Sequence, residues 1–482
     1  MLKTFSKNEI NEFDKFVRSP FHNNRSDVVR FFKALKKFHP SFNHLNFTKE
    51  KIYIKLYPDK KYKDEVMRLL GTQLKNIAKD YLSYKKFSEN TFEKKINFIT
   101  SLFDRNLFKI LDKEIKETRQ ELKQNQLFSP DYFHKLYSIS DMKVNINFFR
   151  GIKKGILENF SETVDNLIYF FITSLFIHIK NKRHYEISYN AKFDKGLLDR
   201  FLNSFNLDKM FNEIKRKPDA KNSLMLALYY SMKVDENPED EEALTKYKEL
   251  LTEYSSGFER ETNTNLYYNL VNILHDRQKK KINSKGYKKM FEVFNEMTSK
   301  NVLTHSDSGY LQEEVIDVII YVALGIDNWK WGEDFIEAII CKVHPDRRDS
   351  IYNFSKASFA HYRKEFNTAL NFLSKVNPPR HVSLSFIKSR NLLCKIYYDL
   401  NCTEQLFSSI DSYRHYLRYD KAVTAEDKTK YLKFLSILSK LLRIKITYNE
   451  HALKILKKNL PSNLTSYKWL LEKIEELEKS NG

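Results

Sequence analysis

Glycine and proline are scarce in this sequence. Each occurs ten times in 482 residues, together about a third of what average usage would give. So few turn-forming residues exclude a loop-rich enzyme barrel, a β-sandwich and a collagen-like or linker-dominated chain. The length instead suits two or three domains, or one repeat array that grows by addition.

Cysteine and long apolar runs are also rare. Three cysteines, Cys341, Cys394 and Cys402, cannot build a disulfide framework and are typical of a reducing cytoplasm. The N-terminus lacks the apolar core of a signal peptide. The most apolar run, Leu167–Ile179, is shorter than the roughly 20 residues that cross a bilayer. We therefore expect a soluble, cytoplasmic protein without a membrane span.

Aromatic and basic residues are abundant. The 37 Phe, 29 Tyr and 3 Trp exclude global disorder. The formal net charge is +21, and its excess lies at the two ends: residues 1–100 carry 22 basic and 11 acidic residues, and residues 351–482 carry 23 and 12. Lysine supplies 63 of the 83 basic residues. Because arginine is preferred for phosphate and guanine contacts, this composition weakens the inference of nucleic-acid binding.

Apolar residues recur at helical spacing almost throughout. Leu107, Leu111 and Ile115, for example, lie on one helix face, with charged residues on the other. Prolines with polar neighbours, as at Asn237-Pro238, end such stretches. The sequence predicts an all-α fold.

One apolar pattern repeats along the second half of the chain. Phe366, Ala369, Leu373 and Val376 are spaced 0, +3, +7 and +10. The same spacing occurs 37 residues earlier, 37 residues later, and a further 42 residues back. These three registers are Trp329, Gly332, Ile336 and Ile339; Thr403, Leu406, Ile410 and Tyr413; and Tyr287, Met290, Phe294 and Met297. A small residue at +3 would let the second helix of a unit approach the first closely.

This pattern resembles the tetratricopeptide repeat, a helix–turn–helix unit of about 34 residues. Its small first-helix residue corresponds to Ala357 and, one unit later, to Cys394. The runs Ala323–Trp329 and Lys395–Leu400 look like uncharacterised helical-repeat proteins common in Bacteroidota-like bacteria, a resemblance that covers roughly residues 200–445. It implies a right-handed superhelical array of antiparallel helix pairs, an α-solenoid, but it says nothing about an activity.

Four segments are predicted. They are a basic helical module at 1–90, a connecting or early repeat region at 91–200, tetratricopeptide-like repeats at 201–420 and C-terminal capping helices at 421–482. In the last segment, Trp469, Leu470, Ile474 and Leu477 form a stripe suited to covering the open end of a core.

The N-terminal module has two interpretations. Helices are expected at Lys7–Arg18, Arg25–Phe38, Thr48–Leu56 and Asp64–Lys86. The last two are similar to the paired helices of winged-helix domains, which would turn Arg68, Gln73, Lys75 and Lys79 toward DNA. Residues 81–92 contain no hairpin that could form a wing. We favour a basic helical cap.

No catalytic, nucleotide or metal site is predicted. The glycines are dispersed, so no phosphate-binding loop exists. Cys341 and His344 have the spacing of half a zinc site but lack a convincing second half. The basic run Arg277–Lys289 is interpreted as a solvated loop, with contact to an acidic partner as the alternative. We predict a non-enzymatic protein without a cofactor.

The favoured function is a scaffold that binds a protein or peptide in a groove lined by first helices. Lys388, Asn391 and Lys395 would form a cationic and amide stripe there. The predicted groove residues are Phe354, Ser358, His361, Tyr362, Lys388, Asn391, Lys395 and Tyr398. The alternative is a nucleic-acid-binding regulator that uses the basic N-terminal module.

Overall fold

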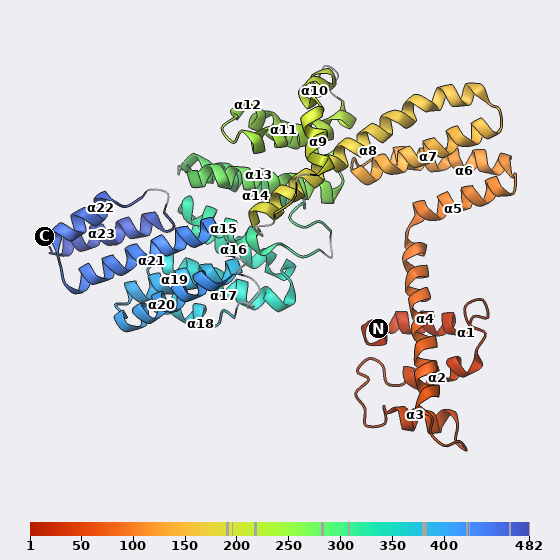
Figure 1. Ribbon diagram of the computed structural model, residues 1–482, viewed down its shortest axis with the longest axis horizontal. Coiled ribbons are helices and arrows are strands. Elements are labelled where there is room, and N and C mark those ends of the chain that lie inside the picture. The colour runs from red at the N-terminus through yellow and green to blue at the C-terminus, as the bar shows by residue number, and fades with distance from the viewer. Residues whose placement is uncertain are drawn as a thin grey trace. The chain divides into compact units, whose positions relative to one another are not determined.

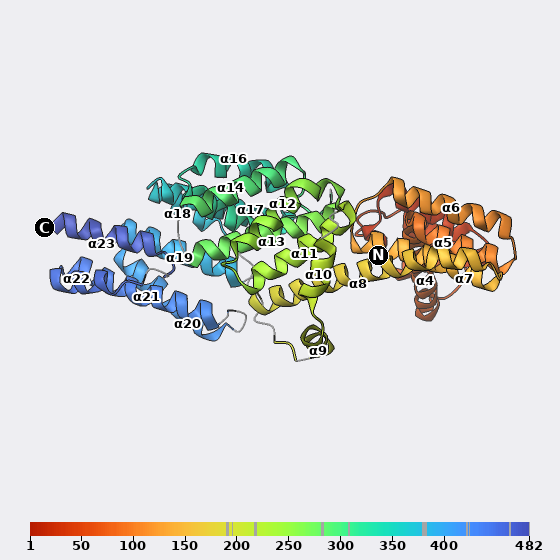
Figure 2. The same ribbon diagram turned by 90° about the horizontal axis from the view of Figure 1, so that it is seen from above.

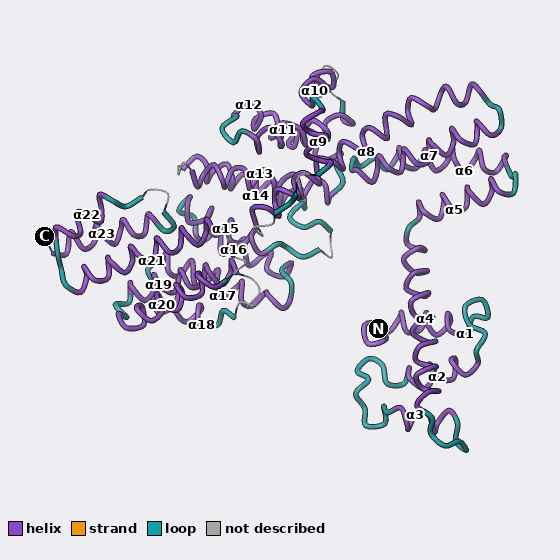
Figure 3. Tube along the Cα trace, viewed as in Figure 1, coloured by secondary structure: helices purple, strands orange, loops and turns teal. Residues whose placement is uncertain are grey.

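The chain folds into helices, which confirms the predicted all-α class. The computed structural model describes residues 1–188, 192–194, 196–215, 219–280, 284–306, 309–377, 383–420, 423, 425–461 and 464–481. Within these residues there is no strand, only one isolated bridge between Phe128 and Phe258 (Figure 3). The predicted breaks at 217–218, 378–379 and 462–463 lie outside the described residues.

The chain divides into two compact units. The N-terminal unit comprises 1–124 and 138–160, and the C-terminal unit comprises 125–137 and 161–482. The first eight helices are α1 Lys7–Arg18, α2 Ser26–Lys36, α3 Lys49–Leu56, α4 Asp64–Glu89, α5 Thr91–Asp104, α6 Phe108–Gln124, α7 Pro130–Phe149 and α8 Lys153–Ser188 (Figure 1).

The first four helices begin and end close to the predicted positions. Ser6 caps α1 through a capping box with Glu9, and the Thr48 side chain accepts the Lys51 amide at the start of α3. These helices enclose a hydrophobic core of their own, drawn from residues 5 to 81. The region 81–92, where a wing would have to lie, is helical on both sides of Asn90.

The C-terminal unit contains the remaining helices. They are α9 Leu197–Ser204, α10 Leu207–Lys215, α11 Ala220–Glu236, α12 Glu241–Tyr254, α13 Arg260–Lys280, α14 Ser284–Ser299, α15 Glu313–Gly325, α16 Trp329–Ile339, α17 Pro345–Tyr362, α18 Phe366–Ser374, α19 Ser383–Asp399, α20 Thr403–Tyr419, α21 Ala425–Ile446, α22 Glu450–Lys458 and α23 Tyr467–Asn481. From α11 to α20 each helix pairs with the next, and α11 also packs on α13, α15 on α17 and α17 on α19.

Three of these pairs have the same turn between their helices. Asp327, Lys364 and Asn401 follow α15, α17 and α19 at intervals of 37 residues, and each has a φ between 55° and 63°. In each turn the next amide donates to the carbonyl five residues earlier, at 2.9 Å. This is the Schellman arrangement that ends many helices. The three turns therefore share one backbone geometry at a constant spacing.

The four apolar stripes recognised in the sequence lie mainly on α14, α16, α18 and α20, the second helices of their pairs. Met290, Ala369 and Leu406 are fully buried, and so is Gly332. A Cβ atom on Gly332 would come within 2.5 Å of the Ala323 Cβ and 2.7 Å of the Phe359 ring. The small residue at +3 thus permits the close approach of α16 to α15 and α17.

The helices α21, α22 and α23 form the last part of the C-terminal unit. They lie side by side in both views (Figures 1 and 2) and pack on one another. Leu470, Ile474 and Leu477 of α23 enter a core that also contains α21 residues such as Leu438. Trp469 is only half-buried and lies at the edge of this core.

One helix among the described residues resembles a membrane span in length and composition. The segment Lys153–Arg183 of α8 has a mean hydropathy of 1.2 in its most apolar window, 28% of which is buried. Core helices of soluble proteins meet the same criteria, so this match is weak evidence. The absence of a membrane span stays a prediction.

Candidate partner-binding surfaces

The predicted groove residues lie on two neighbouring first helices. Four are on α17 and four are on α19. In the structure this α17–α19 face is not open between Asn391 and Asp399, because Ser466 and residues of α23 contact it there. The Ser466 hydroxyl donates to the Asn391 side-chain oxygen at 3.2 Å, and the ring of Trp469 packs edge-on against Tyr398 at 5.4 Å.

Asp399 is the centre of this contact. Its carboxylate, with 2% of the side chain exposed, interacts with the His361 Nε2 at 2.9 Å. It accepts the Trp469 indole N–H at 3.1 Å and pairs with the Lys473 ammonium at 3.0 Å. Groups from α17, α19 and α23 therefore meet on one buried carboxylate. We call these four residues the Asp399 cluster.

Burial and pairing set the charges in the Asp399 cluster. Burial opposes ionisation of Asp399, but hydrogen bonds from His361 and Lys473 outweigh it and hold its pKa below the usual value. Burial lowers the pKa of His361 against the opposing effect of Asp399. Lys473 is also desolvated, yet bonds to Glu476 and Asp399 raise its pKa. At neutral pH the cluster therefore contains an ion pair and an uncharged imidazole.

The rest of the predicted cationic stripe is also engaged within the chain. Lys388 forms an ion pair with Asp317 of α15. The ammonium of Lys395 lies 5.8 Å from the centre of the Trp469 ring, and desolvation lowers the pKa of Lys395 to about 8. Neither lysine is a free cation facing solvent, so the expectation of an exposed basic stripe has to be revised.

The other predicted residues of α17 are placed differently from one another. Ser358 is buried and donates to the Phe354 carbonyl of its own helix at 2.9 Å. Phe354 is half-buried against a hydrophobic cluster. Tyr362 is 39% exposed and donates to Asp327 at 2.6 Å. Of the α17 set, only Tyr362 presents a substantial surface.

Sequence reasoning missed Asp399, Lys473 and the role of Trp469 in this contact. Trp469 belongs to the stripe that was interpreted as a cap, and Lys473, four residues later, lies on the same helix face as Trp469. Asp399 interrupts the run of apolar residues at the end of α19. These two features of the sequence were the signals from which the contact of α23 with Asp399 could have been predicted.

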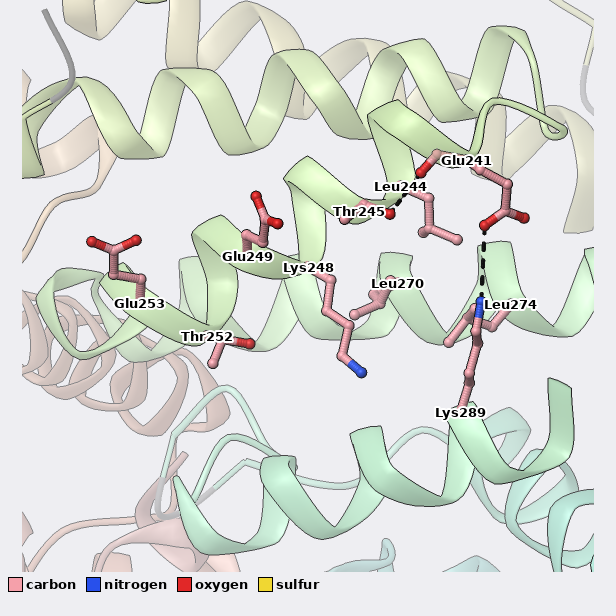
Figure 4. Close-up of a pocket in the computed structure, with 10 residues that line it drawn as sticks. All are labelled: Glu241, Leu244, Thr245, Lys248, Glu249, Thr252, Glu253, Leu270, Leu274 and Lys289. Carbon is pink, nitrogen blue, oxygen red and sulfur yellow. Dashed lines mark hydrogen bonds and ion pairs between the residues drawn. The ribbon is translucent and has the colours of Figure 1, made fainter. Parts of the chain in front are cut away.

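A second candidate surface is a cavity of about 490 Å³ in the C-terminal unit. Its floor is formed by Leu244 of α12 and by Leu270 and Leu274 of α13, and α14 closes one side with Lys289 (Figure 4). The volume falls within the range of small-ligand and side-chain pockets. An apolar side chain fits such a floor.

The rim of this α12–α14 pocket is charged. Glu241 pairs with Arg277 at 2.6 Å and with Lys289 at 3.9 Å at one end. Glu249 and Glu253 stand at the other end of α12 (Figure 4), and Lys248 pairs with Glu292 at 3.3 Å. Glu249 pairs with Lys246 of its own helix at 2.9 Å, so charges of both signs are present at this end as well.

The basic N-terminal module has an exposed lysine face on α4. Lys75 and Lys79 are exposed, and Arg68 is exposed while paired with Asp64 at 2.7 Å. At 3.6 residues per turn these three share a face, whereas Gln73 points to another side and is half-buried. Of the four residues predicted to face DNA, Arg68, Lys75 and Lys79 therefore lie on one face, and Gln73 does not.

The remaining motifs do not assemble into a site. Cys341 is exposed, Cys394 is buried and Cys402 is intermediate. Among the described residues no group of three or more His, Cys, Asp or Glu could hold a metal ion. In the basic run, Arg277 and Lys289 contact Glu241, and residues 281–283 lie outside the described part.

No family model, curated protein or solved structure matches this chain.

Proposed function

We propose that this protein is a non-enzymatic helical-repeat scaffold that binds a protein or peptide partner. Three helix pairs with the same turn at a 37-residue spacing support a tetratricopeptide-like superhelical array. Such arrays act by presenting surfaces formed between successive units. A cytoplasmic location is part of the proposal, as is the absence of a cofactor.

The observation that carries this proposal is the α12–α14 pocket. It lies between the second helices of two successive pairs, with an apolar floor and a rim of carboxylates and lysines. This combination favours a peptide that inserts an apolar side chain and places charged or polar groups against the rim. Because α23 occupies part of the α17–α19 face, the pocket is the surface that we assign to the partner.

A capture experiment tests the assignment. The full chain is used as bait in an extract of its native cells, with one half treated with nuclease. Thr245 is exposed at the pocket, and its hydroxyl donates to the Glu241 carbonyl of its own helix at 2.8 Å. We expect Thr245→Arg to block the mouth of the pocket and abolish capture of the partner without lowering Tm.

The matched control is Thr429→Arg. Thr429 is equally exposed on α21 and makes the same bond to the carbonyl four residues earlier, also at 2.8 Å. Capture should survive this change and the nuclease treatment. Unchanged capture by Thr245→Arg would rule out the pocket. Loss of capture after nuclease treatment would instead favour the nucleic-acid-binding regulator and the lysine face of α4.

A further inference from the structure

The C-terminal helix is held by two chemically different faces. Leu470, Ile474 and Leu477 enter the same core as α21 and α22, as a terminal helix of an array should. Trp469 and Lys473 instead reach the Asp399 cluster. A helix that only closed the end of a core would not need this second, charged contact.

The charged face contributes more to recognition than to stability. Asp399 and Lys473 are nearly buried, with 2% and 7% of their side chains exposed. The desolvation of such a pair offsets most of its attraction. What the pair does provide is discrimination, because a helix without a cation at this position would leave the buried Asp399 carboxylate without its ion pair.

The fit of α23 on the α17–α19 face is incomplete. Asn391 and Tyr398 are buried, with 7% and 3% exposed. Within the described residues, the Asn391 Nδ2 and the Tyr398 hydroxyl find no hydrogen-bond partner. Buried polar atoms without a partner are costly. The face therefore retains hydrogen-bonding capacity that α23 does not use.

We propose that the α17–α19 face is a helix-binding site, that α23 is its built-in occupant, and that a partner helix replaces α23. The partner helix carries an aromatic residue with a lysine four positions later, as Trp469 and Lys473 do. It also supplies an acceptor to the Asn391 amide. This site is separate from the α12–α14 pocket, so either assignment can fail alone.

The first test uses a synthetic, fluorescently labelled peptide of residues 465–482 as the probe. The host is the full chain with Trp469→Ala and Lys473→Met, which keeps the core contacts of Leu470, Ile474 and Leu477. We expect the host to bind the peptide at least about tenfold more tightly than the unsubstituted chain, whose own α23 competes at a high effective concentration. A peptide with the same two substitutions should not bind.

The second test concerns the Asn391 side-chain Nδ2, which has no hydrogen-bond partner among the described residues. A peptide with Ser466→Asn offers an acceptor to the Asn391 Nδ2 and keeps a donor for the Asn391 Oδ1, so it should bind the host about fivefold more tightly than the unmodified peptide, the effect of one net hydrogen bond. Adding Asn391→Leu to the host should remove this advantage. The double comparison separates the Asn391 contact from any effect of the new asparagine on the peptide itself.

The peptide-binding results distinguish a partner helix from a second copy of the chain as the occupant of the α17–α19 face. A host with unchanged far-UV circular dichroism that does not bind the peptide would overturn the proposal. A dimer of the unsubstituted chain that disappears in the host would assign the site to a second copy and also overturn it.

If the host does not fold, hydrogen exchange on the unsubstituted chain tests whether α23 can leave the α17–α19 face while the rest of the unit stays folded. We expect amides of α23 to exchange well before those of 434–442 in α21, because α23 opens locally. Equal protection of the two segments would show that α23 leaves only when the unit unfolds, and the proposal would be wrong.

Discussion

At the scale of single residues, the molecule depends on a few polar groups placed where apolar ones would be expected. Asp399 ends α19 after two tyrosines and is buried by residues that lie far from it in sequence. His361 is 38 residues away and Lys473 is 74 residues away. Such a carboxylate is stable only while its partners remain in place.

Substitution of Asp399 should therefore destabilise the C-terminal unit. Asp399→Asn keeps the shape but removes the charge that faces Lys473, so we expect the free energy of unfolding to fall by about 2 kcal/mol. Chemical denaturation measures it. Asp411→Asn is the control, because Asp411 is 78% exposed and pairs with Arg414 of its own helix, and its loss should cost less than about 0.5 kcal/mol. Equal effects of the two substitutions would contradict the assigned role.

The protonation of His361 gives a second prediction at this scale. Its pKa in the folded chain lies below 6.5, chiefly because of burial, and Lys395 and Lys473 also oppose its protonation. The unfolded chain therefore takes up a proton that the folded chain resists, so stability is lost as the pH falls below about 6.5. Asp399 acts in the same direction at lower pH, because its pKa is also lowered.

A pH series of denaturation curves should show this slope in the unsubstituted chain. In His361→Gln the part of the slope just below pH 6.5 should be absent, while the loss at lower pH remains. An unchanged profile in the variant would mean that another group titrates in that range.

At the scale of helices, close packing between pairs depends on small residues at particular positions. Gly332 is the fourth residue of α16, inside the helix, where glycine is unfavourable for the helix itself. It is tolerated because Ala323 of α15 and Phe359 of α17 occupy the space of a side chain. Packing thus outweighs helix propensity at this position.

Two glycine substitutions should consequently have opposite effects. Gly332→Ala adds a methyl group without room for it, and we expect the free energy of unfolding to fall by about 2 kcal/mol. Gly71→Ala, in the middle of α4, meets no atom within 4 Å and should raise stability by about 0.5–1 kcal/mol through helix propensity. Thermal unfolding of both variants checks this. A stabilising Gly332→Ala would contradict the packing at α16.

The sequence predicted where individual helices begin and end better than it predicted which helices pack against one another. The bounds of α1 were exact because a capping box and a following Ser-Pro mark its ends. The apolar stripes identified which helix face is buried. They could not identify what buries it, so the α17–α19 face was interpreted as an open groove. That α23 covers it depends on the path of the chain after α21, which local spacing does not encode.

The same limit applies to the candidate sites. Lys388 and Lys395 were correctly placed on one helix, but their pairing with Asp317 and Trp469 joins residues about 70 apart. The α12–α14 pocket combines side chains from three helices, and no motif marks it. Local periodicity therefore predicted the fold class, whereas the candidate sites arise from long-range packing.

At the scale of the whole molecule, the chain consists of two units with separate hydrophobic cores. Phe13 is fully buried in the core formed by α1 to α4, whereas Gly332 belongs to the C-terminal unit. Units with their own cores unfold as separate cooperative transitions unless a large interface couples them.

Calorimetry should accordingly show more than one transition. Phe13→Ala should lower the midpoint of one transition through the loss of about 3–5 kcal/mol of core packing, and Gly332→Ala should lower the midpoint of another. A single transition that shifts with both substitutions would show that the units unfold together.

Lys364 has two roles at one position: it forms a turn with a positive φ, and its side chain pairs with α23. Its backbone has a φ of 63°, a conformation in which glycine or asparagine is preferred, and the equivalent positions in the neighbouring turns hold Asp327 and Asn401. A lysine here lies within 3.0 Å of Glu472 and 3.7 Å of Glu476 on α23. A chain selected for the most stable turn would have glycine at this position. With lysine there, the turn is less stable than it would be with glycine. The Lys364 ammonium instead pairs with carboxylates of α23, the helix that we expect a partner helix to replace.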